Sequence, residues 1–151
     1  MMTFENLLEA LGKRLGLEME NAGGAAAVEV DGTAVILQDA GELLLLRAEV
    51  GEIPEDGKLA ILSSAMEANF LYQGTGGATF AVNREDGRLH IHKYNWMERI
   101  DADSVIDAMD KLADTAAAWR RILSEYHPAS DASPTDKPVE DASLNAGFMQ
   151  V

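Results

Sequence analysis

The chain has 151 residues, of which 26 are Asp or Glu and 12 are Lys or Arg, so its formal net charge is −14 at pH 7. A surface this acidic repels the phosphates of nucleic acids and of anionic lipids, and we therefore expect neither nucleic acid nor a membrane as a partner. Cysteine is absent, which excludes disulfides, thiolate nucleophiles and cysteine-ligated metals.

Residues 4–15 predict an amphipathic helix. Apolar side chains recur there at intervals of three and four residues, and charged side chains occupy the opposite face. Thr3 is a suitable N-cap, and Gly16 is a suitable end of the helix.

Residues 25–50 predict three antiparallel strands, because the apolar period changes there from about four to two. Asp31 and Gly32 stand between the first two alternating segments and are typical of a two-residue hairpin turn. Four consecutive leucines, residues 43–46, make the third strand apolar on both faces. We expect such a strand to be covered on both sides.

Residues 58–70 predict a second helix that is apolar nearly all round. A helix of this composition must be buried nearly all round, and one small sheet covers only one side of it. We therefore favour a homodimer in which this helix packs against its copy about a two-fold axis. Cover by the third helix or by the C-terminal tail is the alternative.

The rest of the chain predicts a glycine-rich loop at residues 74–77, a hairpin that turns at Asp86 and Gly87, and a last helix that ends near Tyr126. Residues 1–128 then form one domain, and residues 129–151 are expected to be a flexible acidic tail rich in Pro and Ser. The fold class is α/β of the α+β type, with a small antiparallel sheet. The order is helix, three strands, helix, two strands, helix.

His90 and His92 are the residues with metal-ligand spacing, since positions two apart share one face of a strand. Zinc needs a third and usually a fourth ligand, and the remaining histidine, His127, lies at the far end of the last helix. The loop at residues 74–77 lacks the Lys-Ser/Thr ending of a phosphate-binding loop. We predict no catalytic residue, no cofactor and no metal. A metal-dependent enzyme that uses these two histidines is kept as a third alternative.

The apolar surface exceeds what a small sheet can cover. It predicts either a well-filled core with a dimer seam or a site that receives another polypeptide. Free strand edges and grooves between helix and sheet accept an extended segment by β-augmentation, which requires neither catalytic residues nor a cofactor.

Residues 65–82, AMEANFLYQGTGGATFAV, resemble the second helix, the glycine-rich loop and the fourth strand of the class I type III secretion chaperones, the CesT-like (Tir chaperone) family. Residues 86–89, DGRL, and residues 44–51, LLLRAEVG, are similar to the turn that follows and to the third strand of that family. The resemblance extends over residues 3–126, and the order of elements is the same.

The resemblance implies a cytoplasmic bacterial homodimer that binds the N-terminal region of a secreted effector in extended form and keeps it competent for export. A non-catalytic adaptor or regulatory domain of similar fold is the alternative. The dimer contacts implied are Leu59, Leu62, Met66 and Phe70. The effector-binding residues implied are Leu7, Leu11, Val28, Val30, Leu44 and Leu46.

The tail ends in an apolar segment that contains Leu144, Phe148 and Met149. We predict that these side chains dock into an apolar groove, on this chain or on a neighbouring copy, in imitation of a bound client peptide. Packing between neighbouring molecules is the alternative.

Overall fold

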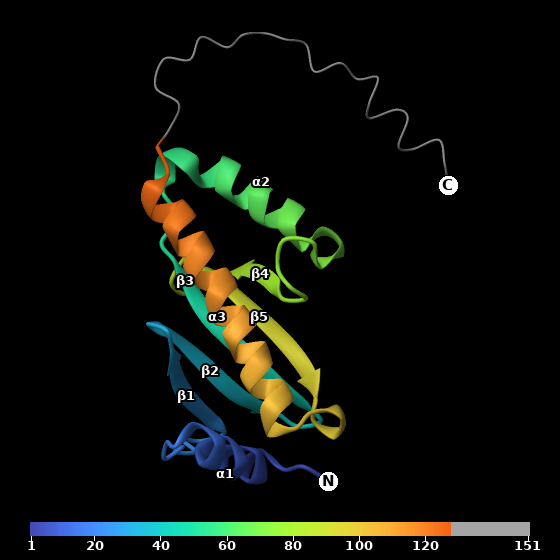
Figure 1. Ribbon diagram of the computed structural model, residues 1–151. Helices are drawn as coiled ribbons and strands as arrows, with labels where there is room; N and C mark the ends of the chain where they lie inside the picture. The colour runs from blue at the N-terminus through green and yellow to red at the C-terminus, as the bar shows by residue number, and fades with distance from the viewer. Residues whose placement is uncertain (128–151) are drawn as a thin grey trace, which may run out of the picture.

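The computed structural model describes residues 1–127, which form a single antiparallel sheet with helices packed on one of its faces (Figure 1). The predicted order of elements and the α+β class are confirmed. The elements are α1 (Phe4–Leu15), β1 (Ala25–Val30), β2 (Thr33–Ala40), β3 (Leu43–Gly51), η1 (Glu55–Gly57), α2 (Lys58–Asn69), η2 (Phe70–Tyr72), β4 (Thr79–Val82), β5 (Leu89–Trp96), η3 (Met97–Arg99) and α3 (Ala102–Glu125). No helix in this part of the chain combines the length and the apolarity that crossing a bilayer requires.

The strands lie in the order β1-β2-β3-β5-β4, and every neighbouring pair is antiparallel. The turn between β1 and β2 is the predicted one. Asp31 and Gly32 have φ angles of 48° and 83°, the left-handed values that a two-residue turn of this kind requires. The register between β3 and β5 shifts between Glu49 and Gly51, where a bulge interrupts the ladder.

One face of the sheet carries the core. Figure 1 shows α3 lying along that face, where it contacts β2, β3 and β5, while α1 packs against α3 and α2 lies beside β4. Side chains alternate along each strand, so every second residue enters this core. The outward leucines of β3, Leu43 and Leu45, are only half-buried. The expectation that β3 is covered on both faces is therefore wrong for the described part of a single chain.

Helices α1 and α3 each begin at a side-chain cap, and the cap of α1 is the predicted one. The Thr3 hydroxyl accepts a hydrogen bond from the main-chain N–H of Asn6 at 3.1 Å, and Gly16 ends α1 with a φ of 66°. At the start of α3, the Asp101 carboxylate accepts from the main-chain N–H of Ser104 at 2.8 Å. The Ser104 hydroxyl lies 2.9 Å from the main-chain nitrogen of Asp101 and accepts from it in return, which completes a capping box.

Arg120 fastens α3 to the sheet at the β3 bulge. Its guanidinium donates to the carbonyl oxygen of Val50 at 3.2 Å, to the carbonyl oxygen of Glu49 at 3.0 Å and to the buried hydroxyl of Thr33 at 3.2 Å. The fixed fork of an arginine suits three acceptors that lie close together. These bonds tie the C-terminal half of α3 to the strands that it covers.

Candidate partner-binding surfaces

The first candidate surface is an apolar ridge on α2 and η2. Its side chains are between 56% and 81% exposed in the described chain. We define the α2 ridge by these residues: Leu59, Met66, Phe70, Leu71 and Tyr72. The opposite side of the helix packs into the core through Ile61 and Ala65. Helix α2 is thus apolar on one side because that side packs into the core, and apolar on the other side because it carries the exposed ridge.

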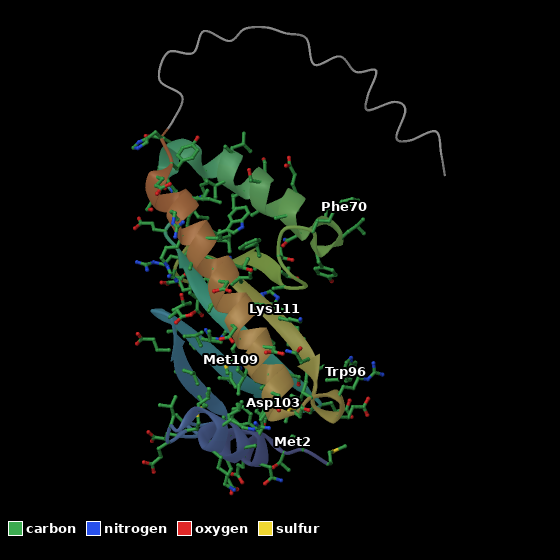
Figure 2. All side chains as sticks on the ribbon, in the orientation of Figure 1. Met2, Phe70, Trp96, Asp103, Met109 and Lys111 are labelled. Carbon is green, nitrogen blue, oxygen red and sulfur yellow. The ribbon has the colours of Figure 1, made fainter. Side chains whose placement is uncertain are left out.

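Three of the four predicted dimer residues lie on this ridge. Leu59, Met66 and Phe70 are seven and four residues apart, a spacing that places them along one face of a helix. Figure 2 shows Phe70 at the end of α2, on the side away from the sheet. Leu62 differs from them, because its side chain is half-buried and packs against the core cluster.

The turn at η2 has an unusual backbone. Leu71 and Tyr72 have φ angles of 53° and 57°, in the left-handed region that residues with side chains seldom adopt. The main-chain N–H of Gly74 donates to the carbonyl of Ala68 at 3.2 Å, which folds the following loop back onto the helix. A Cβ on Gly74 would lie 2.7 Å from the Cβ of Ala68, so glycine is what permits this close approach.

The residues expected to bind an effector are placed differently from the expectation. Five of them are core residues, at most 5% exposed, and cannot reach a partner in this fold. Val30 is half-buried and packs against the same cluster. The residues that belong to the core, and not to an effector-binding surface as predicted, are Leu7, Leu11, Val28, Leu44 and Leu46. Alternation predicted that the strand residues among them share one face, and the structure shows that α1 and α3 cover that face.

The second candidate surface is the outward side of β3 and β5, and it was not among the surfaces predicted from the sequence. Leu43 is the register partner of Trp96, and Leu45 is the register partner of Tyr94. The aromatic rings of this set are about half exposed, and the leucines are half-buried. We call these four residues the outer patch. The alternation of Leu89 and Ile91 with the even positions of β5 was the signal that could have found the two aromatic residues.

The two histidines lie beside the outer patch on β5, but they have different surroundings. His90 Nε2 lies 3.0 Å from a carboxylate oxygen of Asp86. The rings of His92 and Tyr94 lie in a T-shaped arrangement, with 5.9 Å between the ring centroids. Burial lowers the pKa of His92 below its usual value and so favours the neutral ring.

Potential metal ligands also gather at this point. Ligand atoms of Glu49, Asp86 and His90 lie within 4.8 Å of one another. However, Arg88 donates to the Glu49 carboxylate at 3.1 Å, and its main-chain N–H donates to Asp86 at 2.8 Å. That N–H is the main cause that lowers the pKa of Asp86. These bonds within the group account for its arrangement, so we assign no metal to it.

Comparison with known proteins identifies the family. A sequence model of the Tir chaperone protein (CesT) family matches residues 6–120. Comparison with curated proteins gave no match.

Solved structures share the fold. A chain of the heterodimeric ExoU-SpcU complex from the type III secretion system of Pseudomonas aeruginosa is 16% identical, with a TM-score of 0.67 over 80% of this chain and 99% of that one. The Yersinia pestis type III secretion chaperone SycH, in complex with a stable fragment of YscM2, is represented by a chain that is 21% identical. Its TM-score is 0.65, over 78% of this chain and 99% of that one. A chain of the ExsC-ExsE complex is 20% identical, with a TM-score of 0.66 over 82% of this chain and 92% of that one.

Proposed function

The chain belongs to the Tir chaperone protein (CesT) family, and from this premise we propose that it is a type III secretion chaperone. It binds the N-terminal region of a secreted effector in extended form, in the bacterial cytoplasm, and keeps that region competent for export. Binding is the whole activity, with no chemical step and no cofactor. Solved structures with the same fold support this proposal, since they include a chaperone-effector complex, a type III secretion chaperone and a complex from a type III secretion system.

The observation that carries the proposal is the amount of apolar surface that a single chain leaves in contact with water. Scattered exposed apolar side chains are normal, but contiguous ones mark interaction sites. The α2 ridge and the outer patch are two such groups on separate elements. Two surfaces suit a protein that binds a copy of itself and a client together.

The dimer uses the α2 ridge. Leu59, Met66 and Phe70 form its apolar centre, and Leu62 lies beneath them at the margin of the core. A two-fold axis brings the same face of each helix together, so the ridge needs to be complementary only to itself. No acidic side chain belongs to the ridge, so charge repulsion between two chains of net charge −14 does not arise at its centre.

The effector lies on the outer patch. An extended segment alternates its side chains, so every second apolar residue of the client can contact Leu45, Tyr94 and their neighbours. A bound segment forgoes its own folding, and a wide contact area must offset the cost of ordering it. This assignment replaces the core residues that the sequence analysis had implied.

Co-expression tests this function. The full chain is produced together with the product of the adjacent gene and purified through a tag on the chain. We expect the N-terminal region of that product to be retained and to remain sensitive to a protease, as an extended segment is. Retention of a folded, protease-resistant partner would instead support the adaptor alternative.

Two variants locate the client. Leu45→Asp places a charge in the centre of the outer patch and is expected to reduce retention of the client at least tenfold. Ala34→Asp is the control, because it adds the same charge at an exposed position on the same face of the sheet. Ala34 lies near the start of β2, away from Gln38, which is the register partner of Leu45. Equal retention by both variants would contradict the placement of the client on the outer patch.

A further inference from the structure

Strand β5 is paired on both sides over only half its length. Residues 89–92 pair with both β3 and β4, whereas residues 93–96 pair with β3 alone. The second half of β5 is therefore an edge strand in the described part of the chain. Exposed edges invite pairing with another strand, and proteins usually cover or protect them.

The hydrogen bonds of β4 show which main-chain groups are free at this edge. Both main-chain groups of Phe80 bond to the side chain of Asn69, so they face away from β5. Phe80 and Ile91 are consequently a pair without mutual hydrogen bonds. Alternation along β5 then directs the N–H and C=O groups of Tyr94 and the N–H group of Trp96 away from β3. The Trp96 carbonyl is at the N-cap of η3 and accepts the first hydrogen bond of that helix. Within residues 1–127, no loop, turn or cap hydrogen bond uses the N–H or C=O of Tyr94 or the N–H of Trp96.

A groove of about 460 Å³ runs along this edge, between β5 and the N-terminal half of α3. Ile100 and Ala108 are apolar parts of its wall. The side-chain nitrogen of Asn95 is buried there and has no hydrogen-bond partner in the described residues. A buried amide without a partner is costly, so an added acceptor at this point stabilises the structure. Figure 2 places Trp96 and Lys111 on the two elements that border the groove.

The charge of the groove differs from that of the whole protein. Lys93, Arg99 and Lys111 line it, with Asp107 as the one carboxylate among its lining residues. Neither lysine forms an ion pair within residues 1–127. An acidic occupant fits this groove. A second copy paired edge to edge would bring the same cations together across the two-fold axis, which is unfavourable.

We propose that residues 139–151 of the same chain add a strand to the free edge of β5, with Glu140 and Asp141 beside Lys93 and Lys111. This segment follows Pro138 and contains no further proline, so each of its residues has an N–H group to donate. Its apolar residues Leu144, Phe148 and Met149, which are expected from the sequence to dock into a groove, lie outside the described residues. The proposal is independent of the proposed effector function.

The length of the intervening chain permits this contact. From Glu125, the last residue of α3, back to Lys111 is about 21 Å at the rise of an α-helix. The residues between 127 and 139 span up to about 40 Å when extended, so they reach the groove with slack. A tether of this length gives the segment a local concentration in the millimolar range, which makes even a weak contact populated.

A spin label tests the proposal on the full chain. The sequence has no cysteine, so Ser143→Cys carries a nitroxide at one defined position. We expect the amide NMR signals of Tyr94 and Trp96 to lose more than half of their intensity, with recovery when the nitroxide is reduced. Unchanged signals would overturn the proposal. Equal loss of intensity in isotope-labelled chains that carry no nitroxide, when they are mixed with spin-labelled chains, would also overturn it, because the occupant would then be a second copy.

Charge reversal supplies the second measurement. Glu140→Lys combined with Asp141→Lys is expected to raise the hydrogen-exchange rates of the Tyr94 and Trp96 amides at least tenfold. Asp131→Lys combined with Asp136→Lys makes the same change of charge nearer to α3 and is the matched control. Equal exchange in both variants and in the unaltered chain would overturn the proposed pairing, whatever the chain does with a client.

Discussion

The side-chain amide of Asn69 pairs with both main-chain groups of Phe80. Its nitrogen donates to the Phe80 carbonyl at 3.2 Å, and its oxygen accepts from the Phe80 N–H at 2.8 Å. The last residue of α2 thus takes the place of a neighbouring strand at the edge of β4. This contact joins the helix that bears the α2 ridge to the sheet that bears the outer patch.

Asn69→Leu removes both hydrogen bonds while keeping a side chain of similar size. We expect the free energy of unfolding to fall by about 1–3 kcal/mol, because two partly buried main-chain groups lose their partners. Urea denaturation of the full chain measures this difference. Asn83→Leu is the control, since Asn83 is exposed in part and caps only a local turn. Equal loss in the two variants would contradict a special role for Asn69.

Arg120→Lys keeps the positive charge and loses the fork that contacts three oxygens. We expect a loss of about 1.5–3 kcal/mol in the free energy of unfolding, the range for hydrogen bonds to charged groups. Arg121→Lys, on the exposed side of the same helix, is expected to change stability by less than about 0.5 kcal/mol. Similar unfolding midpoints for the two variants would show that charge alone holds α3 at the bulge.

Met66→Glu tests the dimer. A carboxylate at the centre of a buried apolar contact is expected to weaken association at least tenfold, which corresponds to about 1.4 kcal/mol. Ser64→Glu adds the same charge to an exposed position off the ridge and should leave association unchanged. Light scattering on the purified chain measures the mass against the 16.3 kDa of one chain. A monomer before any substitution would contradict the dimer.

Asp101→Ala tests the pH dependence of the α3 cap. The main-chain N–H and the hydroxyl of Ser104 lower the pKa of the Asp101 carboxyl, because both hydrogen bonds favour its charged form. A carboxyl with a lowered pKa stabilises the fold above its unfolded pKa, and this contribution disappears as the pH falls through the folded value. We therefore expect the variant to be less stable than the parent at pH 7.

The difference between the parent and Asp101→Ala should shrink as the pH falls below 3.8, the usual value of an aspartate. Thermal unfolding at a series of pH values measures it. Asp114→Ala, on the exposed side of the same helix, is the matched control. A difference between parent and Asp101→Ala that stays constant from pH 7 to acid would contradict the assignment of the cap to the charged carboxyl.

The sequence predicted the local structure well, because the signals for it are local. Three such features depend only on residues within a few positions of one another: the turn at Asp31 and Gly32, the helix cap at Thr3 and the helix end at Gly16. The family was also recognisable from its order of elements and from residues 65–82. These features require no knowledge of which faces meet in space.

The placement of the binding surfaces was not predictable from the same signals. Alternation shows that Leu44 and Leu46 share a face, but it does not say which face α3 covers. The side chains on the covered face were expected to bind the effector, and they form the core instead. The bonds of Arg120 depend on a register shift between Glu49 and Gly51, and no local pattern reports a shift of that kind.

The backbone at Leu71 and Tyr72 bears on how the α2 ridge evolves. Each residue with a side chain in the left-handed region loses about 1–2 kcal/mol relative to an ordinary conformation, and glycine avoids that loss. A chain selected for thermal resistance alone would therefore carry glycine at both positions. Two bulky side chains stand there instead, so a more heat-resistant descendant that acquires glycine at this turn is expected to self-associate less well.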